Sequence, residues 1–566
     1  MATMETDVCV AGLGAITSRR EVAVWSDLFL AWVDAHRRWL FGALVGIYIA
    51  GINGQWRIEP DSALYLSLAR SIALGHGYTY HHTANASAYP GLPYFLAATL
   101  SLFSSWQTDP LSLFLPNLLM PLAAGATLAL TYRMFRIHAG RPTAVLVTCI
   151  VGLTRTFYRA AFALMTDMPF LLGVMAFLAG YEGLMQYRKL GESLAEPTIG
   201  SADQPPYQTR RWLDWALVIG GGLLTIVMRP AWLAFVPVAL IGFAVAKWRG
   251  RISWRATLIA IVLAAVAAAA FYLADPRQSA GVFRGDRYED QVVLQFLPAQ
   301  QAQLVRNAAA NAFDILRQFV VSALLGIKFG PAPDDPVARH WIDYLVVPIN
   351  FPVAIVTLGL AVSLMRRRAV WGCWVIASIA MMVLVLPLER YFLQVLPLLI
   401  YAWWRGMRWL NRELGRKVSP ELGNLVFFVI ASLGFVPNVL HVFGVVIEQR
   451  SIPFLSHYHD GKYQPLITAA ARIRQTPADT IVLAPYKTAR ILSYLSDRDV
   501  YEINEPDLPW PPRGRPVSVL QQQGDDLMQG WLANLHIDRT AASAAGTGPG
   551  WGNLELRHVQ RGRLPK

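Results

Sequence analysis

Long apolar runs separated by short clusters of basic residues dominate this sequence. A helix that crosses the hydrocarbon core of a bilayer needs about 20 mostly apolar residues, and the pattern predicts about eleven such spans. The expected fold class is therefore an all-α polytopic membrane protein. Six of the predicted spans cover residues 39–55, 111–132, 143–160, 169–186, 256–274 and 422–446. Of the other five, two form a hairpin that turns at Arg229, one ends at Arg366, one emerges at Pro387 and one returns to Arg405.

The basic clusters predict an orientation, because Lys and Arg favour the cytoplasmic ends of spans. Residues 1–38 then form a cytoplasmic lead-in, and residues 39–447 form the multi-span domain. The segments 56–110 and 275–342 lie outside the membrane. Residues 91–106 are apolar enough to span, but a span there would move the later basic clusters outside. We therefore expect 91–106 to lie as an amphipathic helix on the outer surface.

Residues 448–566 are expected to form a small α/β domain outside the membrane. Their composition resembles that of a soluble protein, and they end in a Gly- and Pro-rich stretch. The spacing of apolar residues between polar turns predicts a strand at 479–484, a helix at 487–495 and a second strand at 499–503.

Composition supports a membrane class and excludes others. Hydrophobic residues make up 54% of the chain and charged residues 15%, whereas soluble domains carry about 25% charged residues. A net charge of +13 would suggest a nucleic-acid partner in a soluble protein. Here the basic residues lie between spans, so the expected partners include membrane lipids and no nucleic acid. Three cysteines form no disulfide framework.

Two external acids are the candidates for catalysis. Asp61 follows Pro60 and precedes a short amphipathic helix, and Asp167 lies in the short loop between the third and fourth spans. A carboxylate at the membrane boundary can act as a general base. Both acids can equally be helix caps, because Asp is a favoured N-cap residue.

Basic residues at the outer ends of spans are candidates for binding phosphate, because the arginine fork matches phosphate geometry. Arg390, Arg70 and Arg159 are the chosen candidates for a lipid phosphate. For Arg390 a structural ion pair with the adjacent Glu389 is an equal alternative. The other cations that the topology places outside are Arg57, Arg229 and Lys328.

Several of these motifs occur together in a known family. In order, they are Asp61, Tyr65, Ala69-Arg70, Gly75-His-Gly-Tyr78 and Tyr89-Pro-Gly-Leu-Pro, followed by Asp167, Glu389-Arg-Tyr and Pro397, and Thr476-Pro-Ala-Asp-Thr. The arrangement resembles the GT-C superfamily of glycosyltransferases. Within it, the sequence is most similar to bacterial polyprenyl-phosphate sugar transferases related to protein O-mannosyltransferases and lipid A aminoarabinose transferase.

The resemblance implies an integral-membrane hexosyl- or pentosyltransferase. It would move a sugar, with inversion, from a polyprenyl-phosphate donor to a lipid, glycan or protein acceptor at the outer face of a bacterial inner membrane. In such enzymes the acid that Asp61 matches is the base, and the acid that Asp167 matches supports it or helps to hold a metal. Met165 and Pro169 stand where an Asp-x-Asp pair would be, so we expect metal-independent chemistry without a cofactor.

Two other functions stay open at this stage. A transporter or flippase for lipid-linked sugars would share the spans and the basic loops, although it should show two related halves. A catalytically inactive GT-C-like scaffold is the second alternative, because Ser62 stands where many relatives carry an acid. The sequence does not identify the sugar, the acceptor, the carrier length or the oligomeric state.

Overall fold

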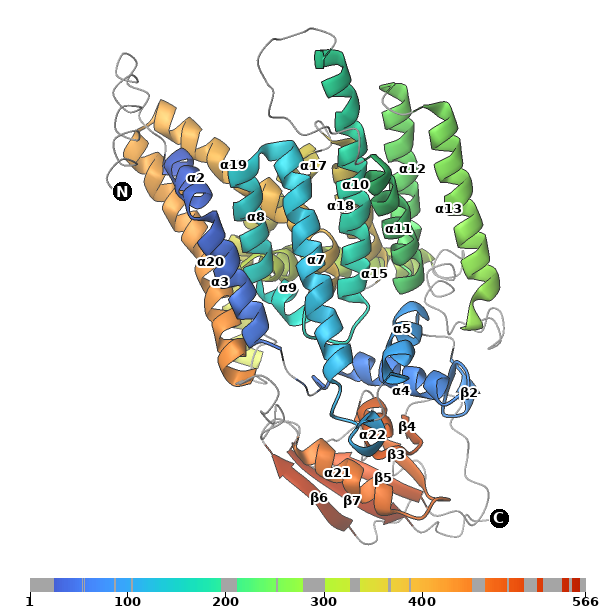
Figure 1. The fold of residues 1–566 in the computed structure, drawn as a ribbon. Coiled ribbons are helices and arrows are strands. Elements are labelled where there is room, and N and C mark those ends of the chain that lie inside the picture. Colours follow the sequence, from blue (N-terminus) through green and yellow to red (C-terminus); the bar gives the residue numbers. More distant parts are fainter. Residues whose placement is uncertain are drawn as a thin grey trace, which may run out of the picture.

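A bundle of helices and a smaller sheet domain make up the chain, with two short helices between them (Figure 1). The structure is a computed structural model. It describes residues 25–194, 211–277, 301–325, 336–449, 464–502, 517–522, 542–548 and 552–559, apart from short gaps at 53, 55, 86–87, 103–104, 251–252, 365–367, 386–387 and 486–487.

Each of the predicted spans falls on a helix of the bundle. The long helices are α2 (Trp25–Ala35), α3 (Arg37–Ala50), α7 (Phe114–Ala139), α8 (Arg141–Leu153), α10 (Asp167–Leu194), α11 (Arg211–Met228), α12 (Trp232–Trp248), α13 (Trp254–Ala274), α17 (Pro336–Ser363), α18 (Ala369–Leu384), α19 (Leu396–Lys417) and α20 (Pro420–Gln449). Shorter elements are α9 (Arg155–Ala160), α15 (Gln301–Asp314), the π-helix η5 (Ile315–Phe319), α16 (Val320–Leu325) and the 3₁₀-helix η7 (Glu389–Gln394).

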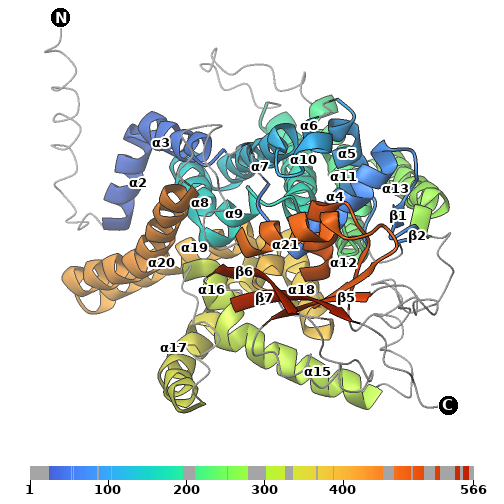
Figure 2. The same ribbon diagram turned by 90° about the horizontal axis from the view of Figure 1, so that it is seen from below.

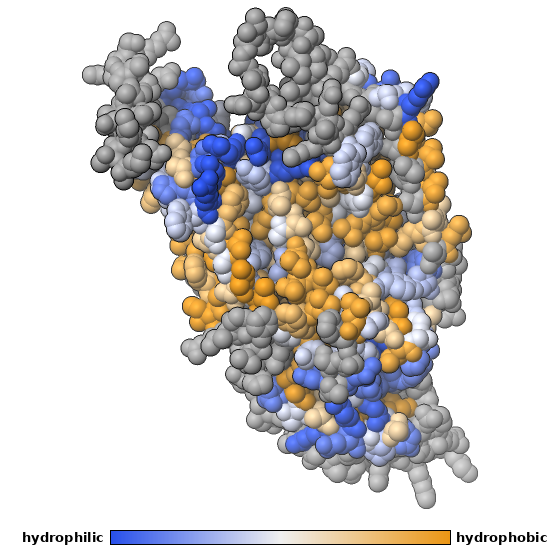
Figure 3. Space-filling view, in the orientation of Figure 1, coloured by the Kyte–Doolittle hydropathy of each residue, from blue (hydrophilic) through white to orange (hydrophobic). Residues whose placement is uncertain are grey.

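The bundle has the surface of a membrane protein. In the described part of the chain, 4 helical stretches are long and apolar enough to cross a membrane, namely Phe114–Ala139, Asp167–Met185, Gln301–Leu325 and Pro420–Ile447. Other bundle helices are apolar but shorter. Figure 3 shows an apolar band across the middle of the bundle on the face in view, with more polar surface above and below it. The chain is therefore a helical membrane protein, and the count of eleven spans stays a prediction.

Two helical segments depart from the sequence prediction. The lead-in contains helix α2, because Leu30 and Val33 are buried against apolar side chains of α8, α19 and α20. Residues 301–325 were expected to form an external segment without a span, yet they are helical and meet the length and hydropathy of one. Figure 2 shows α15 side-on along the edge of the bundle.

Residues 56–110, named the external loop after the sequence prediction, form two short helices that lie between the bundle and the sheet domain (Figure 1). They are α4 (Pro60–Ala73) and α5 (Gly91–Leu100), of 14 and 10 residues. At about 1.5 Å per residue neither reaches the roughly 30 Å of a hydrocarbon core. The loop also contains the strands β1 (Thr79–Tyr80) and β2 (Thr83–Ala84) and the turn of helix α6 (Ser105–Thr108).

The predicted strand, helix and strand of the C-terminal domain are present as β3 (Ile481–Ala484), α22 (Thr488–Ser496) and β4 (Val500–Glu502). Strand β3 pairs in parallel with β4 and with β5, while β7 pairs antiparallel with β5 and β6, so the sheet order is β4-β3-β5-β7-β6. The remaining elements are α21 (Gln464–Gln475), β5 (Val517–Gln522), β6 (Ala542–Gly548) and β7 (Gly552–Val559).

Helix α22 attaches this domain to the external loop. The Tyr494 hydroxyl donates a hydrogen bond to the carbonyl of Pro110 at 3.0 Å. Its ring also meets the buried ring of Trp56 edge-on, with centroids 5.0 Å apart. A face of α22 is thus held against the segment that carries α4.

Glycines bring α10 and α11 into backbone contact. A Cβ added to Gly221 would lie 2.5 Å from the carbonyl oxygen of Gly173 and 2.6 Å from the amide nitrogen of Phe177. Small residues allow such close approach between membrane helices. Because α10 begins with Asp167 and α11 is followed by Arg229, this contact sets the distance between those two side chains.

We expect Gly221→Ala to destabilise the protein, because the new methyl group must push α10 away. Overpacking of this kind costs about 1–3 kcal/mol, which a lower midpoint of thermal unfolding in detergent would report. Gly222→Ala is the matched control, since nothing lies within 4 Å of a Cβ built there. Equal midpoints for the two variants would contradict the close contact.

Candidate functional site

A cavity of about 150 Å³ opens where four elements meet at the sheet-domain end of the bundle. The elements are the starts of α4 and α10, the turn between α11 and α12, and η7. By volume the cavity would hold about five water molecules, which leaves room for a phosphate group. Its lining includes Asp61, Tyr65, Tyr89, Thr166, Asp167, Arg229, Arg390, Tyr391 and Gln394.

Asp61 enters the cavity from the first turn of α4. Pro60 is the first residue of the helix and Glu59 takes the N-cap position, so Asp61 is not the capping residue. Its Oδ2 instead lies 2.7 Å from Nη1 of Arg390, and each side chain is about one-third exposed. This contact also gives Arg390 a partner other than the adjacent Glu389, whose Oε1 accepts a hydrogen bond from Thr156 at 3.2 Å.

Asp167 forms the second ion pair of the cavity. It is the first residue of α10, and its Oδ1 accepts a hydrogen bond from Nη1 of Arg229 in the turn after α11. Asp167 is 5% exposed and the Arg229 side chain is 14% exposed. A buried charge of this kind needs its partner, so the α10–α11 contact and this ion pair support each other.

The two arginines share one aromatic ring. The guanidinium carbons of Arg229 and Arg390 lie 4.6 and 5.5 Å from the ring centroid of Tyr391. Burial alone would lower the pKa of Arg390, but the charges of Asp167 and Asp61 raise it above its ordinary value. Both guanidinium groups therefore remain charged beside the cavity, which suits the binding of an anion.

Tyr65 supplies a neutral hydroxyl on the α4 side of the cavity. Burial, together with the neighbouring charge of Asp61, raises the pKa of Tyr65 to about 12, although a hydrogen bond with Thr166 opposes the shift. The phenol therefore keeps its proton at neutral pH and can act as a hydrogen-bond donor.

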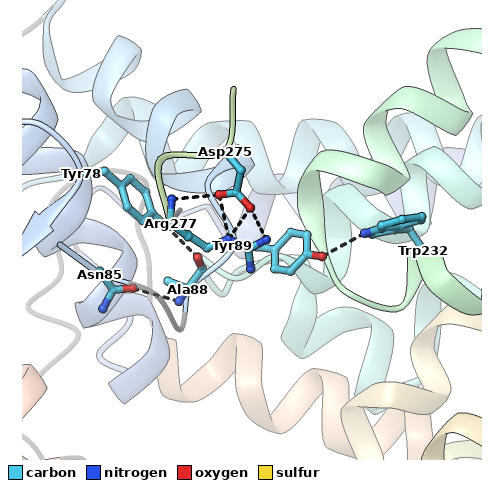
Figure 4. A network of polar contacts seen from close by, with 7 residues as sticks. All are labelled: Tyr78, Asn85, Ala88, Tyr89, Trp232, Asp275 and Arg277. Atoms are coloured by element: carbon cyan, nitrogen blue, oxygen red, sulfur yellow. Dashed lines mark hydrogen bonds and ion pairs between the residues drawn. The ribbon is translucent and has the colours of Figure 1, made fainter. Parts of the chain in front are cut away.

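Tyr89 lines the cavity and is held by a polar network (Figure 4). Its hydroxyl accepts a hydrogen bond from Nε1 of Trp232 at 2.9 Å. The guanidinium of Arg277 lies 4.1 Å from its ring centroid and pairs with Asp275, both of these side chains being 3% exposed. Three separate segments thus fix one wall of the cavity.

We expect Tyr89→Phe to lower stability by about 1 kcal/mol, because the half-buried indole N–H loses its hydrogen-bond partner while the ring is kept. A lower thermal midpoint would report it. In a cycle with Trp232→Phe the two losses should not add. Tyr94→Phe, on the same loop but 47% exposed, is the control. Additive losses would show that the hydrogen bond contributes nothing.

The cavity thus collects Asp61, Asp167 and Arg390 of the five site residues predicted from the sequence. Arg70 lies elsewhere, with Nη2 2.6 Å from Asp497 of the sheet domain and its guanidinium over Trp106. Arg159, on α9, lies 3.9 Å from Glu59 and outside the lining of the cavity.

Other predicted candidates have different outcomes. Arg229 was one of six external cations in the sequence and proves to line the cavity. Lys328 falls outside the described residues. Among the residues that are described, no group of three His, Cys, Asp or Glu side chains is arranged to hold a metal ion. Metal-independent chemistry remains a prediction.

Sequence comparison identifies no relative, since neither a family model nor a curated protein matches this chain. Structure comparison, in contrast, finds solved structures that are similar to this chain. The crystal structure of ArnT from Cupriavidus metallidurans in the apo state matches with a TM-score of 0.53 and 13% identity, over 93% of this chain and 97% of ArnT. The chain has the fold of ArnT. The ArnT structure bound to undecaprenyl phosphate matches equally, with a TM-score of 0.52 and 13% identity over 93% and 98% of the two chains.

ArnT, the lipid A aminoarabinose transferase, is a member of the GT-C superfamily. The GT-C resemblance in the sequence is thus confirmed at the level of the fold. A weaker match, with a TM-score of 0.45 and 12% identity over 84% of this chain and 65% of the other, is the oligosaccharyltransferase of Archaeoglobus fulgidus.

Proposed function

We propose that this protein transfers a sugar from a polyprenyl-phosphate donor to an acceptor on the extracytoplasmic side of the membrane, and that Asp61 is the general base. The observation that supports this proposal is the composition of the cavity. The cavity combines two carboxylates with two arginines at the sheet-domain end of the bundle, in a chain with the ArnT fold. ArnT itself has been crystallised with undecaprenyl phosphate, which makes a lipid phosphate the first ligand to test.

In the proposed reaction a hydroxyl or amine of the acceptor attacks the anomeric carbon of the donor. The new bond to the acceptor forms as the bond between that carbon and the phosphate oxygen breaks. The electron pair of the broken bond leaves with the phosphate, and Asp61 accepts the proton of the acceptor. A single displacement of this kind inverts the anomeric configuration.

Arg390 and Arg229 would bind the phosphate and stabilise the charge that it gains as it leaves. Arg390 pairs with Asp61 at 2.7 Å. A phosphate that takes over this arginine would release one oxygen of the base. Binding of the donor would then prepare Asp61 for the acceptor.

The distribution of basic residues supports the orientation. The ends of α7, α12 and α19 that point away from the sheet domain (Figure 1) carry Arg136, Lys247 and Arg416. Positive charge favours the cytoplasmic side, so the cavity and the sheet domain would face outward. In a bacterium this places the protein in the inner membrane.

The decisive test supplies purified protein in lipid with sugar donors that differ in the group to which the sugar is attached. Polyprenyl-phosphate sugars should support transfer or donor hydrolysis with inversion, whereas nucleotide sugars should support neither. Anomeric configuration can be followed by NMR. A protein that moves lipid-linked sugar across vesicles without turnover would be a transporter, and one that does neither would be a scaffold. Either result would reject the proposal.

A further inference from the structure

The sheet domain contributes a side chain to the candidate active site. Arg490, on α22, places Nη1 3.6 Å from Oδ1 of Asp61. Its Nε donates a hydrogen bond to Oε1 of Glu502, at the end of β4, at 2.9 Å. The arginine is 21% exposed and Glu502 is 15% exposed. One end of the guanidinium is thus anchored in the sheet domain while the other faces the base.

The two oxygens of Asp61 have different partners. Oδ2 lies 2.7 Å from Arg390 of the bundle, a distance typical of a charge-assisted hydrogen bond. Oδ1 lies 3.6 Å from Arg490, which is too long for a hydrogen bond but close enough for electrostatic attraction. Oδ1 therefore keeps a lone pair for an incoming proton while the carboxylate is held from both sides.

Arg490 does not line the cavity, so it reaches Asp61 from the sheet-domain side. Its surroundings favour a fixed position. Helix α22 is held against the external loop, because Tyr494 bonds to Pro110 and packs on Trp56. The link from Glu502 through Arg490 to Asp61 consequently connects the two domains.

We propose that Arg490 is a positioning residue for the base, and that the sheet domain is thereby part of the active site. Arg490 holds Asp61 so that Oδ1 faces the acceptor while Arg390 is engaged by phosphate. The proposal rests on the proposed function. It assigns Oδ1 as the oxygen that accepts the proton.

The role predicts an effect on turnover rather than on donor binding. Misplacing a catalytic group by about 1 Å can cost 10²-fold in rate. We expect Arg490→Gln to lower kcat by about tenfold, with the KM for the donor unchanged because Arg390 can still bind the phosphate. Glu502→Ala, which removes the acceptor at the other end of the guanidinium, should lower kcat in the same way. The double variant should lose no more than Arg490→Gln alone.

Chemical rescue separates positioning from folding. Millimolar guanidinium should restore part of the kcat of Arg490→Ala, because the small cation can occupy the vacated site beside Asp61. Arg498→Gln is the control. This arginine belongs to the same domain and donates to the carbonyls of Thr476 and Pro477, whereas the ion pairs of Asp61 are with Arg390 and Arg490. It should keep its kcat and show no response to guanidinium.

Each outcome decides the question. A wild-type protein that transfers sugar, with a tenfold slower Arg490→Gln variant and guanidinium rescue, supports the proposal. Wild-type kcat in Arg490→Gln, or an equal loss in Arg498→Gln, overturns it and leaves the proposed function intact. A rise in donor KM without a change in kcat also overturns it. A wild-type protein that transfers nothing from any donor rejects both proposals.

Discussion

Replacing Asp61 with Asn should reduce kcat by about 10²- to 10⁴-fold, because the amide cannot accept the proton of the acceptor. Shape and size are kept, so the acceptor and donor should still fit the cavity. The assay is sugar transfer from a polyprenyl-phosphate donor by protein in lipid, with wild type and variant compared at saturating donor.

Loss of folding would not explain such a result. Asp61 and Arg390 are 33% and 36% exposed, and ion pairs with this much exposure contribute about 1 kcal/mol or less. We expect the thermal midpoint of Asp61→Asn to stay near that of the wild type. Glu59→Gln removes an acid two residues earlier, outside the lining of the cavity, and should keep full turnover. Near-normal transfer by a folded Asp61→Asn protein would remove Asp61 from the role.

Much of the fold could be predicted because membrane helices have a strong sequence signal. The eleven apolar segments coincide with helices, and α22 lies within one residue of its prediction at each end. The prediction missed α2, whose apolar face is short, and the helical stretch over residues 301–325, whose start is polar. Hydropathy over a span-length window does not detect a helix that is partly polar.

The site could be predicted where its residues lie close to the ends of predicted spans. Asp61, Asp167 and Arg390 come together because they follow or precede spans that end at the same side of the bundle. Arg70 was predicted with them, but it lies nine residues after Asp61 on α4, about 13 Å along the helix. There it faces Asp497 instead.

Arg490 illustrates what the sequence could not reveal. It lies in the C-terminal domain, among residues that carry no motif, and only the docking of α22 on the external loop brings it to Asp61. Contacts between domains depend on tertiary packing, for which a single sequence holds no periodic signal. Arg229 was identifiable as an external cation, but its pairing with Asp167 depends on the glycine contact between α10 and α11.

Replacing Arg390 with Gln should lower kcat/KM by about 10²- to 10³-fold, the usual cost of losing one donor to a developing anion. Two effects contribute. The donor phosphate loses a charged ligand in the ground state, so the KM for the donor rises, and the leaving phosphate loses stabilisation, so kcat falls. Arg390→Lys should recover part of the loss, because the charge returns without the planar fork.

Donor affinity should respond differently to Asp61→Asn and to Arg390→Gln. Arg390 is shared between Asp61 and the proposed phosphate, so the carboxylate competes with the donor for the same guanidinium. Asp61→Asn removes the competitor and should bind the donor as tightly as the wild type or more tightly, although it turns over slowly. Arg390→Gln removes the ligand and should bind the donor more weakly. Calorimetry with a polyprenyl phosphate measures both. Unchanged affinity in Arg390→Gln would assign this arginine to holding Asp61, because an arginine that does not bind phosphate can act on the reaction only through the base.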